Sequence, residues 1–217
     1  MTQGSTKHTS PRYFVLARIS GLFGVFSLGL FLLILFSDTV TLLYADREIV
    51  QGLVRWQTTP FFIFFDTVLI ILPLVGHLVF FIFRFFRCRL NVHLYPYPEN
   101  LRFVMLKIAG VLGLSFVGYH VGQLYGVYFE GMAGYQYLQT AIRAHQNLPT
   151  IILYWTGLAG LGYYFFQLVW DQCIDFGICV SKTSQRVLTL VCLSGFLFYI
   201  LVGLVLMIKA VFGAIEP

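Results

Sequence analysis

Long apolar runs separated by short polar segments dominate the pattern of this chain. Five runs have 19 or more residues: 19–37, 60–83, 108–129, 148–170 and 187–208. Asp66 is the only charged residue within any of them. A helix needs about 20 mostly apolar residues to cross a bilayer, whereas the strands of a membrane barrel alternate in polarity over about 10 residues. The pattern therefore predicts five membrane-spanning helices.

We expect an all-α protein in which these helices pack as one integral membrane bundle. The expected helices cover about 14–37, 60–86, 102–129, 148–170 and 187–212. The sequence contains no internal repeat and no separate soluble segment, so residues 1–217 are interpreted as a single membrane domain. Because so little of the chain lies outside the apolar runs, we expect it to be non-catalytic alone and to serve an enzyme only together with partners.

The composition agrees with this interpretation. Hydrophobic residues make up 59% of the 217 residues and charged residues 11%, whereas soluble domains contain about 45–50% apolar and about 25% charged residues. These values exclude a soluble enzyme domain, a disordered protein and a secreted disulfide scaffold. The net charge is +5, but Lys and Arg form no tract suited to nucleic acid. We therefore expect membrane lipid, and no nucleic acid, around the chain.

The distribution of Lys and Arg predicts the orientation in the membrane. The richer set of flanks holds ten of them: Lys7, Arg12, Arg18, Arg84, Arg87, Arg89, Arg102, Lys107, Lys182 and Arg186. The opposite set holds four: Arg47, Arg55, Arg143 and Lys209. Because Lys and Arg accumulate on the cytoplasmic side, the N-terminus is predicted to be cytoplasmic and the C-terminus to lie outside. Residues 1–12 are polar and the first apolar run is long enough to span, so no cleavable signal is expected.

Two histidines lie within the apolar runs, where polar groups are costly and usually functional. At a rise of about 1.5 Å per residue, His77 lies roughly 25 Å from the outer end of the second helix, in the inner leaflet. By the same measure His120 lies roughly 27 Å from Arg102, in the outer leaflet. Two histidines at opposite depths suggest two stacked haems. Position alone slightly favours the other interpretation, in which each imidazole hydrogen-bonds to a neighbouring helix.

Glycines mark where helices are expected to approach closely. Gly118, Gly122 and Gly126 form a stripe with the spacing typical of close helix contact on the third predicted helix. Gly157 and Gly160 share a face of the fourth helix with Tyr164. A groove of glycines with a cation at its rim would also suit a flat macrocycle or a quinone.

Four segments carry a resemblance to a known family. They are residues 18–24 (RISGLFG), 72–77 (LPLVGH), 107–110 (KIAG) leading to Tyr119 and His120, and 184–186 (SQR). In order and spacing the chain resembles the dihaem cytochrome b membrane anchor of bacterial succinate dehydrogenase and fumarate reductase, in its single-chain, five-helix form. The resemblance runs from about Phe14 to Phe212.

The resemblance implies haem b as a cofactor, but only half of the expected ligands are present. In that family four helices each supply one axial histidine, two to each haem. His77 matches the second-helix ligand of the inner haem and His120 the third-helix ligand of the outer haem. The other two positions fall at about Leu35 and Tyr164. We hypothesise that the outer haem is absent and that the inner one is absent or abnormally ligated, with Tyr164 either ligating the iron or hydrogen-bonding to His77.

The resemblance also implies partners and a function. The chain would hold a flavoprotein subunit and an iron–sulfur subunit at the cytoplasmic face of the bacterial inner membrane, and electrons from succinate would pass to a quinone, typically menaquinone. Arg84, Arg87, Arg89 and Arg102 are expected to contribute to docking. Without a haem relay, quinone reduction is expected near the inner face. The candidate residues for that site are Arg18, Ser20, Arg84, Lys107, Trp170, Ser184 and Arg186.

Two other interpretations of the chain stay open. An unrelated cytochrome b anchor would carry paired histidines at matched depths. A transporter or channel would show inverted repeats or charges at the midplane. Asp66, near the outer end of the second helix, is either a proton or quinone-site residue or a group that reaches the interface.

Overall fold

The computed structural model describes residues 11–87, 94–95, 97–130 and 147–212, and in these residues the regular structure is helical throughout. The elements are α1 (Pro11–Tyr44), α2 (Arg47–Gln57), α3 (Pro60–Asp66), the π-helical segment η1 (Thr67–Ile71), α4 (Leu72–Arg87), α5 (Pro98–Glu130), α7 (Leu148–Asp175) and α8 (Lys182–Phe212). The expected all-α class is confirmed for this part of the chain.

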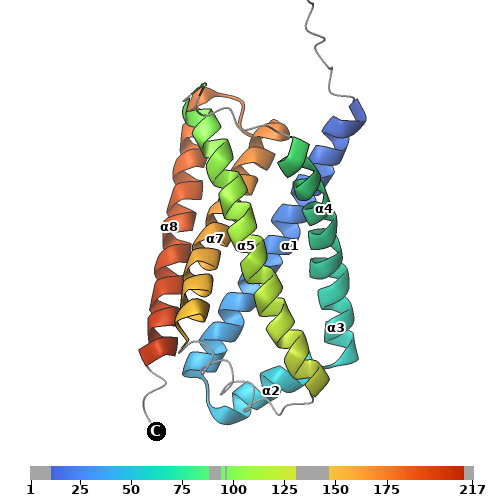
Figure 1. Cartoon of the computed structure of the whole chain (residues 1–217), viewed down its shortest axis with the longest axis vertical. Coiled ribbons are helices and arrows are strands. Elements are labelled where there is room, and N and C mark those ends of the chain that lie inside the picture. The colour runs from blue at the N-terminus through green and yellow to red at the C-terminus, as the bar shows by residue number, and fades with distance from the viewer. Residues whose placement is uncertain (1–10, 88–93, 96, 131–146, 213–217) are drawn as a thin grey trace, which may run out of the picture.

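The long helices run side by side as a bundle (Figure 1). Helical backbone continues from α3 through η1 into α4, so these elements form one rod. The start of α1, the end of α4, the start of α5 and the end of α7 meet at one end of the bundle, which we call the α1 end (Figure 1). The short helix α2 crosses the opposite end, which we call the α2 end.

Four helical stretches are long and apolar enough to cross a membrane. They are Arg12–Thr41, Pro60–Arg87, Pro98–Gln123 and Lys182–Lys209, and each contains or overlaps a span predicted from the sequence. The fourth predicted span, 148–170, forms most of α7, but α7 is not in this set. Glycine, tyrosine and tryptophan take the place of many aliphatic residues in α7, which lowers its mean hydropathy. This composition agrees with the packing of α7 against three other helices, α1, α5 and α8. The five-span count therefore stays a prediction.

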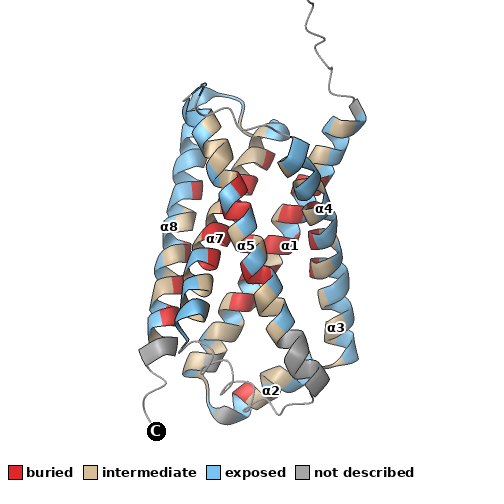
Figure 2. Ribbon diagram, in the orientation of Figure 1, coloured by how far each residue is buried: buried red, intermediate tan, exposed pale blue. Residues whose placement is uncertain are grey.

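The core lies where the long helices cross in the middle of the bundle (Figure 2). Glycines allow α5 and α7 to pack backbone to backbone: a Cβ on Gly113 would lie 3.1 Å from the Leu161 Cα, and one on Gly160 would lie 3.1 Å from the Ala109 carbonyl oxygen. The predicted contact through Gly118 and Gly122 is not found among the described residues, because a Cβ on either would meet no described atom within 4 Å. The close face of α5 lies about one turn nearer its start.

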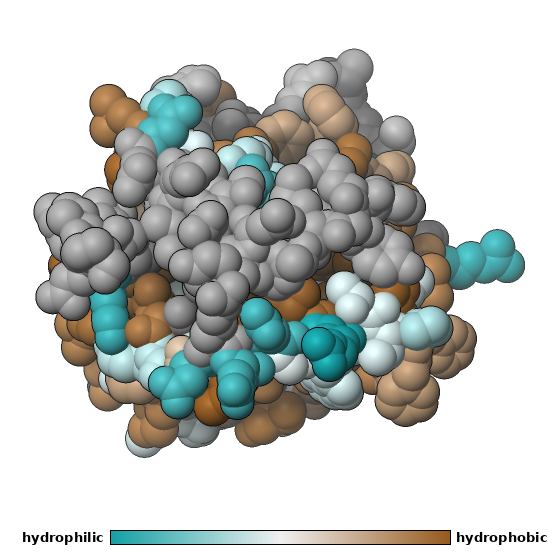
Figure 3. Space-filling model, turned by 90° about the horizontal axis from the view of Figure 1, so that it is seen from below, coloured by the Kyte–Doolittle hydropathy of each residue, from teal (hydrophilic) through white to brown (hydrophobic). Residues whose placement is uncertain are grey.

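Hydrophobic side chains cover the outer surface of the bundle. On α8, for example, Leu190, Val191 and Phe198 are exposed, and such a surface is suited to lipid acyl chains. Seen from the α2 end, the described hydrophobic residues lie mainly around the rim, and the described hydrophilic ones gather in a band of the end face (Figure 3).

Candidate functional site

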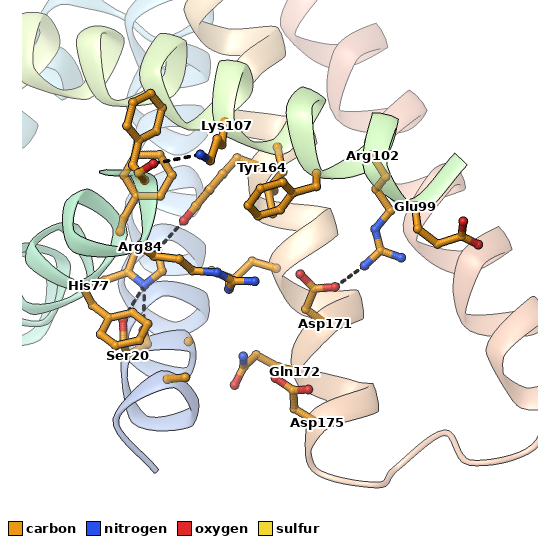
Figure 4. A pocket seen from close by; sticks show the side chains of 18 residues that line it. Ser20, His77, Arg84, Glu99, Arg102, Lys107, Tyr164, Asp171, Gln172 and Asp175 are labelled. Carbon is orange, nitrogen blue, oxygen red and sulfur yellow. Dashed lines mark hydrogen bonds and ion pairs between the residues drawn. The ribbon is translucent and has the colours of Figure 1, made fainter. Parts of the chain in front are cut away.

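A cavity of about 350 Å³ opens at the α1 end between α1, α4, α5 and α7 (Figure 4). Phenylalanines form part of its wall, among them Phe80, Phe81, Phe85 and Phe103. The polar and charged residues that line it are Ser20, His77, Arg84, Glu99, Arg102, Lys107, Tyr164, Asp171, Gln172 and Asp175.

His77 is buried on the cavity wall and is held by two other helices. Its Nδ1 lies 2.7 Å from the Ser20 carbonyl oxygen on α1, and its Nε2 lies 2.7 Å from the Tyr164 hydroxyl on α7. A carbonyl oxygen only accepts hydrogen bonds, so the network assigns the proton to Nδ1, and Nε2 then accepts from Tyr164. This neutral imidazole ties α4 to both α1 and α7, and the hydrogen bond to Tyr164 is one of the two alternatives expected from the sequence.

Two glycines on α1 make space for polar groups of the cavity. A Cβ on Gly24 would lie 2.6 Å from His77 Nδ1 and 2.7 Å from a Leu168 methyl carbon. A Cβ on Gly21 would overlap the side-chain amide of Gln172. A Cβ on either glycine would therefore lie closer to the facing polar group than ordinary carbon contacts allow. The imidazole of His77 and the amide of Gln172 can occupy their positions because α1 carries no side chain at these two glycines.

Lys107 is a buried cation on the α5 side of the cavity. Its Nζ donates a hydrogen bond to the Phe85 carbonyl oxygen at 2.8 Å, and it lies 4.8 Å and 5.1 Å from the ring centroids of Phe85 and Phe103. The last carbonyls of a helix have no partner within the helix, so Lys107 satisfies one near the end of α4. A positive charge is also favourable there because of the helix dipole.

Arg102 forms an ion pair with Asp171 across α5 and α7. Its guanidinium lies 3.9 Å from the ring centroid of Trp170. With the Gln167 amide oriented so that its oxygen faces Arg102, that oxygen accepts two hydrogen bonds, at 2.7 Å and 3.0 Å. Asp171 lies beyond the predicted end of the span at Trp170; burial raises the pKa of its carboxyl, and the charge of Arg102 opposes this rise.

Three of the seven predicted quinone-site residues line this cavity, namely Ser20, Arg84 and Lys107. The other four do not. Arg18 donates to the Asp175 backbone carbonyl, Trp170 donates to the Thr189 hydroxyl, the Ser184 hydroxyl bonds Ser181 at the start of α8, and Arg186 is exposed. Sequence reasoning missed Asp171, Gln172 and Asp175 in this role. Helical spacing from Tyr164 could have found them, because positions seven, eight and eleven residues further on share its face.

The arrangement around His77 does not fit a haem iron held between His77 and Tyr164. Iron bonds of about 2 Å to both atoms would place Nε2 and the hydroxyl oxygen about 4 Å apart, whereas they lie 2.7 Å apart. The space beside the pair, lined by Gly110, Gly113 and Leu161 among others, is about 20 Å³, which is room for about one water molecule and far too little for a macrocycle.

His120 is likewise surrounded by protein groups. Its Nδ1 lies 3.3 Å from the Tyr154 hydroxyl. Its ring stacks on Phe116 with centroids 5.8 Å apart and meets Phe31 edge-on at 6.0 Å. Leu35, at the position of the missing partner, is buried and offers no ligating atom. His8, His93 and His145 lie outside the described residues, as does Arg89.

Comparison with known proteins gives one informative result. The chain is similar to the succinate dehydrogenase cytochrome b558 subunit of Bacillus subtilis (strain 168). The two are 27% identical over 206 residues, which cover 93% of this chain and 97% of that subunit. No protein-family profile and no solved structure matches the chain. A similarity along almost the whole of both chains supports the resemblance drawn from the sequence. The haem ligands and the quinone site stay predictions.

Proposed function

We propose that this chain is the membrane anchor subunit of a succinate:quinone oxidoreductase. It holds the flavoprotein and iron–sulfur subunits at the cytoplasmic face of a bacterial inner membrane and forms the quinone site, and it is not catalytic alone. The observation that carries the proposal is the polar cavity at the α1 end, in a chain similar over 93% of its length to a succinate dehydrogenase cytochrome b subunit.

The cavity has the size and lining that a quinone headgroup needs. Small-molecule sites are usually 300–1,000 Å³ and combine apolar walls with a few placed polar groups, and this one has about 350 Å³, a phenylalanine wall and the donors of Arg84 and Lys107. A quinone carbonyl oxygen accepts hydrogen bonds, and the side chains of Arg84 and Lys107 can donate them. We take menaquinone as the expected substrate from the family resemblance.

Charge supports the assignment of the α1 end to the cytoplasm. The described Lys and Arg residues at that end are Arg12, Arg18, Arg84, Arg87, Arg102, Lys107, Lys182 and Arg186, against Arg47, Arg55 and Lys209 towards the α2 end. This imbalance follows the positive-inside rule. Arg84 and Arg87 are exposed at the end of α4, where they are available to an iron–sulfur subunit, and a short path from its clusters to the cavity needs no haem relay.

The same geometry supports an anchor without a bis-histidine haem. Both ring nitrogens of His77 are engaged by Ser20 and Tyr164, and Leu35 cannot pair with His120. We expect the reduced-minus-oxidised spectrum of the purified complex to lack the bands of a bis-imidazole cytochrome b. Such bands at two haems per complex would refute this part of the proposal.

Copurification tests the anchor function. When the chain is produced with the flavoprotein and iron–sulfur subunits of the same organism and extracted in mild detergent, we expect the three to copurify and to reduce a quinone with succinate. A chain that purifies alone, while the soluble pair reduces a dye unaided, would contradict the proposal. Genes for both partners next to the gene of this chain would support it independently.

A further inference from the structure

One polar group of the cavity, the side-chain amide oxygen of Gln172, has no hydrogen-bond partner among the described residues. The side chain of Gln172 is buried, with 8% of the residue exposed, and its Oε1 makes no hydrogen bond to any described residue. Buried polar atoms in native proteins nearly always have a partner, and an exception needs an explanation. Gln172 lines the cavity and extends from α7 towards α1 (Figure 4).

A glycine on the neighbouring helix leaves the space that this amide occupies. Gly21 of α1 is buried directly against it, and a Cβ at that position would overlap the amide. The position of the unpaired oxygen is therefore fixed by packing. It is held in place by the close approach of two helices.

The other buried or half-buried polar groups on the cavity wall already have partners. Both His77 nitrogens and the Tyr164 hydroxyl belong to one network, Lys107 donates to the Phe85 carbonyl, and Asp171 pairs with Arg102. Among the buried described residues that line the cavity, the Gln172 oxygen is the acceptor that stays unpaired. Arg18 Nε is a second buried polar atom without a partner among the described residues, but Arg18 does not line the cavity. The partner that the cavity can offer the Gln172 oxygen is a hydrogen-bond donor on a ligand.

We propose that Gln172 accepts a hydrogen bond from a hydroxyl group of the reduced quinone. This inference rests on the proposed function. Reduction adds two electrons, from the iron–sulfur subunit, and two protons, from water, and converts both carbonyl oxygens of the quinone into hydroxyls. The oxidised ring has acceptors only, whereas the hydroquinone has donors. An acceptor on the protein therefore binds the hydroquinone more tightly than the quinone, and this difference favours reduction of the bound ring.

The test compares the two directions of the reaction in the complete three-subunit complex. Gln172→Met keeps the length of the side chain and removes its hydrogen-bonding groups. Loss of one buried hydrogen bond corresponds to a change of about 2- to 13-fold. We expect the KM for a water-soluble hydroquinone, with fumarate as oxidant, to rise by about that factor, while the KM for the matching quinone, with succinate as reductant, changes less than about twofold. Succinate oxidation by a soluble dye should stay unchanged.

Matched controls separate this role from a general defect. Gln123→Met makes the same chemical change in the part of α5 nearer the α2 end, away from the cavity, and should leave both KM values unchanged. Gly21→Ala displaces the amide without altering Gln172 and should reproduce the effect of Gln172→Met, whereas Gly52→Ala, at an exposed glycine with open space around it, should not.

The outcomes are distinguishable. The informative case is an assembled Gln172→Met complex with normal dye activity. Equal rises in both KM values, or no rise in either, would then overturn the inference about Gln172 without contradicting the proposed quinone site. A wild-type complex that reduces the dye and no quinone would overturn the quinone site, and the inference with it.

Discussion

The hydrogen bond between His77 and Tyr164 gives the sharpest prediction about stability. Tyr164→Phe removes only the hydroxyl and leaves His77 Nε2 buried without its donor at 2.7 Å. Leaving a buried acceptor unpaired costs about 1–3 kcal/mol, whereas hydrogen bonds between membrane helices average about 0.6 and reach about 1.7 kcal/mol. We therefore expect a loss of about 1–2 kcal/mol, because the acceptor is buried and is shared by three helices. For a chain of this length the loss corresponds to a Tm lower by about 2–8 °C.

The assay is thermal unfolding of the purified complex in one detergent at one protein concentration. Tyr163→Phe is the matched control: it makes the same change one residue earlier, where the hydroxyl makes no hydrogen bond to any described residue, and it should leave the Tm unchanged. Equal Tm values for the two variants would refute the argument that the pair ties α4 to α7. Because the substitution adds no atoms, a loss cannot be attributed to overpacking.

Three further predictions concern the walls of the cavity and the membrane. Gly24→Ala places a Cβ 2.6 Å from His77 Nδ1, so we expect the ring to shift and the complex to lose about 1–3 kcal/mol; thermal unfolding beside Gly52→Ala would show it, and equal values would contradict the steric argument. Lys107→Met leaves a carbonyl near the end of α4 without its charged donor, so the Tm should fall more than for the exposed Lys182→Met; an equal fall would contradict this role. A thiol reagent that cannot cross membranes should label a cysteine placed at Thr183, at the start of α8, only after inner-membrane vesicles are made inside-out, and labelling of intact spheroplasts would reverse the proposed orientation.

Much of the fold could be predicted because hydrophobicity is a local property. Each of the four helices that are long and apolar enough to cross a membrane contains most of a predicted apolar run, and such a run must form a helix in lipid to satisfy its own backbone. The amphipathic helix α2 was not predicted, because it lies within a polar segment between two spans. The contact through Gly118 and Gly122 is not found among the described residues for a related reason: small-residue spacing identifies a face that permits close packing, and it does not determine which face of α5 meets α7.

The site was predictable only in part. From residue identity and helical rise, the sequence alone predicted that His77 and His120 are polar groups at membrane depth. The resemblance to the cytochrome b anchors then implied that their partner positions fall at about Tyr164 and Leu35. Only the tertiary structure decided that Tyr164 reaches His77, that Ser20 fixes its proton and that Gln172 is seated on Gly21. Those contacts join residues 57, 87 and about 150 positions apart in the chain. They depend on the rotation and axial position of each helix against its neighbours, and packing among all the helices sets both.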